Sequence, residues 1–304
     1  MSSSDDGLAR SLQVRLARHA KAISVDPNLV LTRYALERFL YRLSCSPYAE
    51  RFVLKGGLLI LVWLGEALRP TRDADLLGFG DLSEAALAEI FSDVCAMQVD
   101  ADGMVYMKDS LRVEPIRAQD DYGGQRVNLQ ARMGAARLSV QLDIGIGDVV
   151  TPAAEWLDYP SLLELPRPRL RAYPRETVLA EKLHAMEYLG LRNSRMKDYF
   201  DVHALLREGK TDTAQLGAAI AATFTRRRTA LPDGMPQGLK DEFASDAARQ
   251  AQWGQFLVRN RLAAPPLDLV ITGIRDLISE PMRLARQGLR HRDSRQRRRE
   301  ARPG

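Results

Sequence analysis

The sequence contains little cysteine and little histidine. Its 304 residues include only Cys45 and Cys95, fifty positions apart, which excludes both a disulfide scaffold and a cysteine metal cluster. A reducing cytoplasm fits this composition. The four histidines, His19, His184, His203 and His291, are scattered without the spacing of a zinc motif such as HExxH. We expect His184 and His203 to be partly buried polar residues and not catalysts.

A long apolar run is also missing. The longest, residues 56–65, reads GGLLILVWLG and has roughly half of the ~20 residues that are needed to cross a bilayer. After its first charged residues, the N-terminus shows no apolar core of a signal peptide. We therefore expect no membrane partner and no secretion, and we place the protein in the cytoplasm.

Charge is unevenly distributed along the chain. The formal net charge is +5, but residues 281–304 hold nine Arg against Asp293 and Glu300, a local net charge of +7. Residues 1–280 therefore carry a net charge of −2. With 45% hydrophobic residues, the chain is long enough for one large or two modest domains. The sequence is a nearly neutral body with a basic tail, and such a tail is typical of contact with nucleic acid.

Hydrophobic spacing predicts a helix, a strand and a second helix in the first part of the chain. In residues 28–43, apolar side chains recur at steps of three and four, which is typical of an amphipathic helix. Residues 52–54 form a short β-rich run, followed by Gly56 and Gly57 and then by the apolar run. We interpret this order as strand, glycine turn and buried helix. Residues 73–77 predict a further short strand.

A β-hairpin is predicted over residues 125–147. Two stretches with alternating apolar residues flank a turn at residues 134–135. By alternation, Asp143 projects from the face opposite the apolar residues of the second strand. It is the only charge in that strand after Arg137.

The second half of the chain has a mainly helical pattern. Five prolines and little periodicity between residues 152 and 174 indicate a linker, with the domain boundary at about residue 170. Beyond it the pattern predicts a helix over 176–189, which ends at Gly190, and a helix over 195–207, which Ser194 caps. An exposed loop is predicted over 226–240. Residues 267–289 predict one or two helices around Pro281. The basic tail, residues 290–304, has almost no apolar residue and is expected to be disordered or to extend the last helix.

Two carboxylates and the glycine pair form the clearest candidate for a reactive site. Asp73 and Asp75 lie at i and i+2 of a strand, so both can bind one hard divalent cation or two adjacent ones. Asp143, on a neighbouring strand, is placed by alternation to complete the oxygen ligands, and Mg²⁺ is the natural occupant. Gly56 and Gly57 let backbone N–H groups approach phosphate oxygens at the start of the following helix. These are the components of nucleotidyl transfer.

Each of these features also has a plain structural explanation. A glycine pair is often only a turn, and an Asp-x-Asp at a strand end is often surface charge or a cap. Arg72 either neutralises phosphate charge or balances Asp73. The order and spacing of the features are more specific than any one of them.

The arrangement as a whole resembles a known family. The order of its motifs is similar to that of the DNA polymerase β-like nucleotidyltransferases. In this order a Gly-Gly pair is followed, after fifteen residues, by Asp-hydrophobic-Asp-hydrophobic and then by an Asp on a later strand. Three stretches within residues 28–207 resemble the AbiEii/AbiGii toxin family, the nucleotidyltransferase toxins of type IV abortive-infection toxin–antitoxin systems. They read RFLYRLSCSPYAERFVLKGGLLILVWLG, LRPTRDADLLG and TVLAEKLHAMEYLGLRNSRMKDYFDVHAL. The family usually has Ile or Leu where this chain has Ala74.

The resemblance implies a fold and a set of nucleotide-binding residues. The fold would be α/β (α+β), with a mixed-sheet nucleotidyltransferase core and N-terminal helices in residues 1–170 and a helical domain in residues 171–289. The glycine pair would bind the triphosphate, with Lys55 beside it. Asp73 and Asp75 would bind Mg²⁺.

In the helical domain, the resemblance implies that Lys182 contacts the phosphates or the acceptor. Asp198 or Asp201 would be the further catalytic aspartate. The residues alone leave alternatives open. Asp198 lies in the first turn of its predicted helix, where the helix dipole favours a carboxylate by roughly 0.3–1 kcal/mol, so a capping role would also explain it. Both aspartates could also form ion pairs with neighbouring basic residues. Glu181 and Lys182 could equally lie on a solvated helix face.

The function implied by the resemblance is Mg²⁺-dependent transfer of NMP from an NTP to an acceptor. That acceptor would be the 3′ end of tRNA, so that aminoacylation and translation are blocked, and a cognate antitoxin would be encoded beside the toxin. The alternatives are nucleotidylation or phosphorylation of a protein hydroxyl, and a non-catalytic nucleic-acid-binding module whose Asp pair is structural. The basic tail would raise RNA affinity through phosphate contacts, or would be a solvated end without a role.

Overall fold

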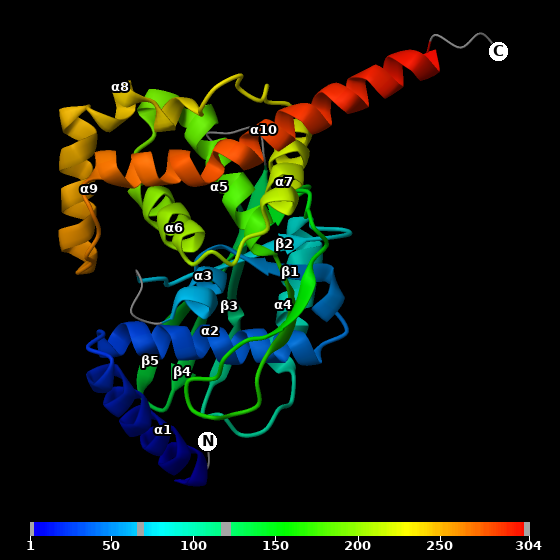
Figure 1. Ribbon diagram of the computed structural model, residues 1–304. Coiled ribbons are helices and arrows are strands. Elements are labelled where there is room, and N and C mark those ends of the chain that lie inside the picture. Colours follow the sequence, from blue (N-terminus) through cyan, green and yellow to red (C-terminus); the bar gives the residue numbers. More distant parts are fainter. Residues whose placement is uncertain (1–2, 66–69, 117–122, 301–304) are drawn as a thin grey trace. The chain divides into compact units, whose positions relative to one another are not determined.

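The chain divides into two compact units in the computed structural model, which describes residues 3–65, 70–116 and 123–300 (Figure 1). The side chains of residues 3–5 and 292–300 are not described. Unit 1 comprises Met1–Gly147 and Glu155–Ala172, and unit 2 comprises Asp148–Ala154 and Tyr173–Gly304. Within the described ranges, unit 1 holds the strands and unit 2 is built from helices.

Unit 1 is built on a mixed seven-stranded sheet in the order β3-β4-β5-β2-β1-β7-β6. The pairs β2–β5 and β1–β7 are parallel, and the other neighbours are antiparallel. The strands are β1 (Phe52–Lys55), β2 (Ala74–Gly78), β3 (Val105–Ile116), β4 (Gly124–Met133), β5 (Ala136–Ile146), β6 (Glu155–Asp158) and β7 (Arg169–Ala172). The short strand β2 therefore lies in the middle of the sheet, although its partner β5 follows much later in the sequence.

An aromatic cluster joins two helices of unit 1, α2 and α4, to the sheet. The helices of this unit are α1 (Ser3–Ala22), α2 (Pro27–Cys45), α3 (Gly56–Leu64) and α4 (Glu84–Ala96), with a short 3₁₀ turn at Ala49–Arg51. Phe39 of α2 contacts Phe91 of α4 and Tyr106 of β3, and Phe91 also contacts Phe52 of β1. The contacts join two helices and two strands, so α2 and α4 cover the same part of the core.

Local sequence signals account for the starts of these helices. The side chain of Asp26 accepts a hydrogen bond from the backbone N–H of Asn28, and Pro27 occupies the first helical position of α2. Ser83 caps α4 in the same way. The predicted helix at 28–43, the strand–glycine–helix order at 52–65, the strand at 73–77 and the hairpin at 125–147 are all confirmed. The predicted α/β class with a mixed sheet is confirmed as well.

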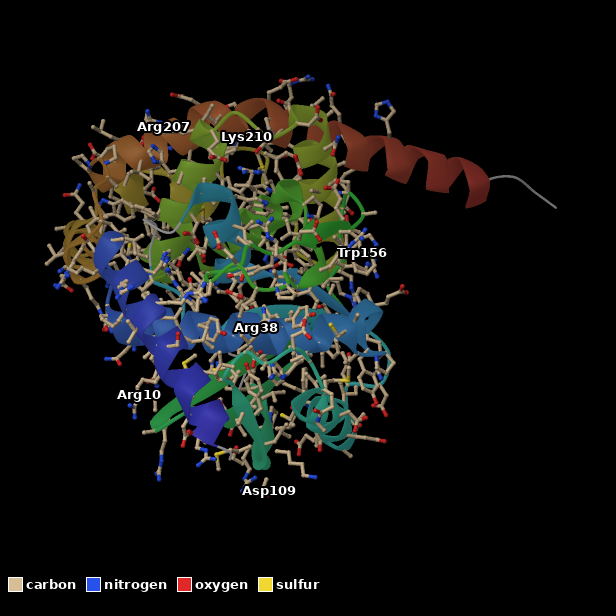
Figure 2. All side chains as sticks on the ribbon, turned by 90° about the horizontal axis from the view of Figure 1, so that it is seen from below. Arg10, Arg38, Asp109, Trp156, Arg207 and Lys210 are labelled. Atoms are coloured by element: carbon tan, nitrogen blue, oxygen red, sulfur yellow. The ribbon has the colours of Figure 1, made fainter. Side chains whose placement is uncertain are left out.

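A linker was predicted between residues 152 and 174, but the structure shows two strands in this segment. These strands, β6 and β7, extend the sheet beyond β1. Each strand has only four residues and the segment is rich in proline, so neither strand shows a readable alternation. Trp156, which is labelled in Figure 2, lies on the edge strand β6 and is half exposed. Arg169 of β7 lies over its ring.

Unit 2 is a set of helices with two short 3₁₀ turns, at Gly190–Arg192 and Gln237–Leu239. They are α5 (Arg175–Leu189), α6 (Met196–Arg207), α7 (Thr213–Arg226), α8 (Asp241–Ala244), α9 (Ala247–Asn260) and α10 (Leu267–Glu300). The predicted helices over 176–189 and 195–207 are confirmed by α5 and α6. Within the described part of the chain, no helix is long and apolar enough to cross a membrane.

Two details of unit 2 differ from the sequence expectations. Ser194 does not cap α6; instead, the side chain of Asn193 accepts a hydrogen bond from the backbone N–H of Arg195. The loop predicted over 226–240 is not exposed throughout, because Leu239 is buried in the second 3₁₀ turn.

The prediction of one or two helices around Pro281 is confirmed, since one helix, α10, runs through this proline. Of the two alternatives for the basic tail, the structure shows the helical extension over residues 290–300, while residues 301–304 lie outside the described ranges.

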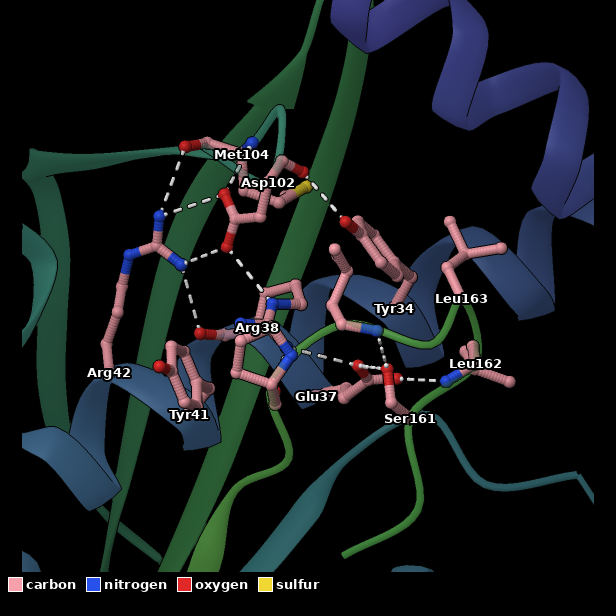
Figure 3. Close-up of polar contacts among 12 residues, drawn as sticks. Tyr34, Glu37, Arg38, Tyr41, Arg42, Asp102, Met104, Ser161, Leu162 and Leu163 are labelled. Carbon is pink, nitrogen blue, oxygen red and sulfur yellow. Dashed lines mark hydrogen bonds and ion pairs between the residues drawn. The ribbon is translucent and has the colours of Figure 1, made fainter. Parts of the chain in front are cut away.

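A buried network of charged residues ties α2 to the loop before β3 (Figure 3). The carboxylate of Asp102 accepts hydrogen bonds from Arg38 Nε at 3.1 Å and from both terminal nitrogens of Arg42 at 2.6 and 3.1 Å. The Tyr34 hydroxyl donates to the backbone carbonyl of Asp102. Arg38, labelled on α2 in Figure 2, is 1% exposed and Asp102 is 3% exposed, so the pairing is shielded from water.

The same helix holds the segment between β6 and β7. Glu37 accepts hydrogen bonds from the hydroxyl of Ser161 and the backbone N–H of Leu162, each at 2.9 Å. Arg38 donates to the carbonyl of Pro166 at 2.7 Å. Burial raises the pKa of Glu37, and these donors oppose that rise. The charged side chains of α2 therefore fix two long loops of unit 1.

Substitution Asp102→Asn is expected to lower the free energy of unfolding by about 3–5 kcal/mol, because the buried guanidinium groups of Arg38 and Arg42 lose the carboxylate that they share. The measurement is urea unfolding followed by fluorescence. Asp109→Asn is the matched control, since Asp109 is exposed on β3 (Figure 2) and its change should stay within about 0.5 kcal/mol. Equal effects of the two substitutions would contradict a supporting role for Asp102.

Candidate active site

Four charged residues form one row across the middle of the sheet in unit 1. Lys55 of β1 is the register partner of Asp75 of β2, Asp75 is the partner of Asp143 of β5, and Asp143 is the partner of Arg126 of β4. Partners on neighbouring strands point to the same face. We call Lys55, Asp75, Asp143 and Arg126 the charge row. Each member is partly exposed, whereas the residues next to them on the strands, Leu54, Leu76, Leu142 and Val127, are buried.

The glycine pair begins α3 directly beside Asp75. Gly56 has φ +70°, and a Cβ on it would fall 1.8 Å from Asp75 Oδ2, so only glycine fits this position. The backbone N–H of Gly57 lies 3.4 Å from the same oxygen. Lys55 precedes the helix without capping it through its side chain. The N-terminus of α3, which favours negative charge, therefore faces a carboxylate that is predicted to bind metal.

The side chain of Lys55 reaches from β1 across β2 to β5. Its Nζ lies 3.5 Å from the position that a Cβ of Gly145 would occupy on β5. Gly145 follows Asp143 by two residues and so shares its face of the strand. The Lys55 amine is thereby held on the same face of the sheet as both carboxylates of the row.

Arg126 is the residue of this site that sequence reasoning missed. Its Nε and a terminal nitrogen donate to the two carboxylate oxygens of Asp143, each at 2.8 Å. The hydrogen bond to Asp143 raises the pKa of Arg126, and Asp73 adds to that rise through its charge. The signal was available, because a hairpin with a two-residue turn at 134–135 places residue 126 opposite residue 143.

Of the three predicted metal ligands, Asp75 and Asp143 are register partners on neighbouring strands, whereas Asp73 precedes the strand. Asp73 lies immediately before β2 and, like Asp75, is partly exposed. Asp143 is engaged on both oxygens by Arg126. Among the described residues, no group of three or more His, Cys, Asp and Glu side chains is arranged to hold a metal ion. Asp73 and Asp75 offer the oxygen donors that Mg²⁺ prefers, and Asp143 could join them only after separating from Arg126.

A second cluster forms in unit 2 around Lys182 of α5. Its Nζ donates to Asp198 Oδ1 at 2.5 Å and to Asp201 Oδ2 at 2.9 Å, both on α6. Arg195 forms a further ion pair with Asp198 at 2.7 Å. Asp198 and Asp201 are fully buried and Lys182 is 12% exposed. Lys182 therefore does not lie on a solvated helix face, and the three predicted residues lie together.

Electrostatics keep the carboxylate of Asp198 ionised. Burial alone would raise the pKa of Asp198, but the charges of Lys182 and Arg195 outweigh burial and hold its pKa at about 2. One turn of helix separates Asp198 from Asp201, so both carboxylates face the same amine. The aspartates are thereby fixed as acceptors from Lys182.

His184 of α5 and His203 of α6 are partly or fully buried, as expected from the sequence. The Nε2 of His184 lies 2.8 Å from the hydroxyl of Thr229 and its Nδ1 lies 3.3 Å from Arg227. A guanidinium can only donate, so Nδ1 accepts and the ring is neutral with its proton on Nε2. Burial, with the nearby charge of Arg227, lowers the pKa of His184 to about 4. Burial also lowers the pKa of His203.

The predicted site residues thus fall into two groups, one in each unit. Unit 1 holds the glycine pair, the charge row and Asp73, with Arg72 exposed beside them. Unit 2 holds Lys182, Asp198 and Asp201. The first group combines partly exposed oxygen donors, cations and a helix N-terminus, which is the chemistry that a polyphosphate with its cation requires.

Comparison with known proteins gives a family match over most of the chain. A family profile described as "Nucleotidyl transferase AbiEii toxin, Type IV TA system" matches residues 38–278. Among solved structures, a protein from H. pylori described as a candidate nucleotidyltransferase is 14% identical with a TM-score of 0.47, covering 86% of this chain and 98% of that chain. JHP933 from Helicobacter pylori is 13% identical with a TM-score of 0.46, covering 89% and 99%. No curated protein matches the sequence.

Substitution Gly56→Ala is expected to displace the Asp75 carboxylate and to destabilise unit 1 by about 1–3 kcal/mol, because the new Cβ overlaps Asp75 Oδ2 and the backbone conformation strains an L residue. A crystal structure and urea unfolding of the variant measure both effects. The control is Gly254→Ala in α9, where nothing lies within 4 Å of the added Cβ. Alanine should be neutral or favourable there by up to about 1 kcal/mol.

Substitution Lys182→Met is expected to lower the free energy of unfolding by about 3–5 kcal/mol, because two fully buried carboxylates lose their shared partner. Lys197→Met, at an exposed position of the same helix α6, is the matched control and should change stability by less than about 0.5 kcal/mol. Urea unfolding at neutral pH compares the two. A small effect at Lys182 would show that the cluster does not depend on its amine.

Proposed function

The chain belongs to the AbiEii family of nucleotidyl transferase toxins of type IV toxin–antitoxin systems, and on this premise we propose that it transfers NMP at the charge row of unit 1. Membership makes the protein a nucleotidyltransferase, with an NTP as substrate and a cognate antitoxin as partner. In the proposed reaction an acceptor hydroxyl attacks the α-phosphorus of the NTP. The new bond joins the acceptor oxygen to that phosphorus, and pyrophosphate leaves.

One observation carries the choice of site. The start of α3, the carboxylate of Asp75 and the carboxylate of Asp143 adjoin one another on one face of the sheet, with a cation at each end of the row. Carboxylates placed side by side repel each other, and Lys55 and Arg126 offset part of this repulsion. A bound cation with its polyphosphate would offset more of it.

Three groups of unit 1 are suited to the triphosphate. Backbone N–H groups at the start of α3, including that of Gly57, point toward the position of an anion. The Lys55 amine provides a compact positive charge on the same face. Arg72, exposed next to Asp73, can reach phosphate oxygens from solvent. Together they would orient the NTP.

Asp73 and Asp75 would hold Mg²⁺. Both are partly exposed and supply only oxygen donors, which suits this ion. When bound, it would neutralise phosphate charge and polarise the α-phosphate as a Lewis acid. Asp143 would take part after Arg126 has moved away from its carboxylate, and the freed guanidinium would then be available to a phosphate oxygen.

Lys182 would contact the phosphates or the acceptor from unit 2. Asp198 and Asp201 would act by positioning its amine, because both are fully buried and both accept from it. A carboxylate with a pKa of about 2 is a poor acceptor of the proton of an attacking hydroxyl, which argues against Asp198 as a general base.

The proposed acceptor is RNA, namely the 3′ end of tRNA in the cytoplasm. Its modification would block aminoacylation and so translation, as expected of a toxin. Family membership and the local charge of +7 in residues 281–304 support this choice over a protein hydroxyl.

The test uses the full-length protein with Mg²⁺, total RNA and each of the four α-labelled NTPs. Asp75→Asn is expected to lower transfer of label by at least about a hundredfold, because a metal ligand supplies several kcal/mol of transition-state stabilisation. Asp109→Asn, the exposed control, should retain full transfer. Removal of divalent ions with EDTA should abolish transfer, and added Mg²⁺ should restore it.

The labelled product separates the alternatives. Label in a tRNA-sized band from the unmodified protein and from Asp109→Asn supports the proposal. Label in protein would instead identify a protein hydroxyl as acceptor, and transfer from γ-labelled ATP alone would contradict nucleotidyl transfer at this site. Full activity of Asp75→Asn would place the reaction elsewhere.

A further inference from the structure

The C-terminal part of α10 extends beyond the packed helices of unit 2. Among the residues of α10 with described side chains, the last buried one is Ala285, preceded by Ile274, Ile278 and Met282. From Arg286 to His291 the side chains are exposed or partly exposed. Arg286 donates hydrogen bonds to the backbone carbonyls of Pro232 and Gly234, in the loop after α7. The backbone nevertheless stays helical through Glu300 (Figure 1).

This extension, residues 286–300, is here called the basic arm. Its sequence holds seven Arg against Asp293 and Glu300, while residues 1–280 carry a net charge of −2. As a helix of fifteen residues it is about 22 Å long. The arm therefore carries most of the excess positive charge of the chain within one helix.

The composition of the arm indicates what kind of partner it fits. A helix in contact with a protein needs an apolar stripe, because the centre of a protein interface is apolar. Leu289 is the only large apolar residue of the arm, so such a stripe is missing from its sequence. Contacts with phosphates require cations and hydrogen-bond donors, and arginine supplies both.

We propose that the basic arm binds the phosphate backbone of a structured RNA. The binding is independent of base sequence, since phosphates carry no sequence information. A polyanion also offsets the repulsion among the arginines, which otherwise disfavours a helix. The arm thus raises the affinity for an RNA acceptor without containing any of the proposed catalytic residues.

This inference deepens the proposed function and rests on it for the identity of the acceptor. The binding measurement is nevertheless made without NTP, so it does not depend on nucleotidyl transfer. Asp75→Asn should bind RNA as tightly as the unmodified full-length protein. If nucleotidyl transfer fails while the arm still binds RNA, the proposed reaction is wrong but the proposed binding of RNA by the arm is correct.

The experiment compares two triple variants of the full-length protein with the same loss of charge. One changes Arg295, Arg297 and Arg298 of the arm to Gln, which preserves helix propensity. The control changes Arg10, Arg18 and Arg167, three exposed residues of unit 1, to Gln. The probe is a fluorescently labelled RNA hairpin, and binding is measured by anisotropy between about 50 and 200 mM salt.

The arm variant should bind the hairpin at least about tenfold more weakly at low salt, with a salt slope lower by about 2–3. The control should keep the affinity within about twofold, because its residues lie outside the arm. Replacing the three arm arginines by Lys should restore most of the binding, since the charge returns.

Equal losses of RNA affinity in the arm variant and the control would show that only the net charge of the protein matters, and would overturn the proposal. Unchanged RNA binding by the arm variant would also overturn it. A specific loss of antitoxin binding with RNA binding intact would assign the arm to a protein partner and overturn it as well.

Discussion

Two carboxylates side by side in the middle of a sheet are the constraint on which the rest of unit 1 depends. Asp75 and Asp143 are register partners on parallel strands, and like charges in that position destabilise a sheet. Lys55 and Arg126 at the two ends of the row offset the repulsion, because the charges across four strands then run plus, minus, minus, plus. Such a row adds little to stability over apolar residues, which is typical of a site that is kept for its chemistry.

The row also explains a glycine that has no role in an ordinary strand or helix. Gly56 is required because any Cβ would overlap the Asp75 carboxylate, and its positive φ turns the chain from β1 into α3. A Cβ on Gly145 of β5 would touch the Lys55 amine only at an ordinary contact distance, so glycine is not required there. The close approach of the Asp75 carboxylate therefore determines where a side chain must be absent. The glycine pair is more than a turn signal.

Much of unit 1 could be predicted because its signals are local. The hairpin follows from alternation and a short turn, and its register would have identified Arg126 as well. Other features depend on contacts between distant segments. The charged residues Glu37 and Arg38 of α2 suggest a solvent face, yet they are buried because loops from elsewhere in the chain cover them. The two aspartates of α6 could be placed on one helix face by spacing, but their shared partner Lys182 is defined only by the packing of α6 on α5.

Burial separates the carboxylates that hold the fold from those that are open to a ligand. Asp102 and Asp198 are 3% and 0% exposed, and each is paired with two cations. Removing a charge from water costs several kcal/mol unless partners compensate it, so these carboxylates cannot leave their cationic partners without that cost. Asp73 and Asp75 keep part of their exposure and can exchange water for a cation. By the same argument, unit 2 can offer a substrate the amine of Lys182, which reaches the surface, but not the aspartates that hold it.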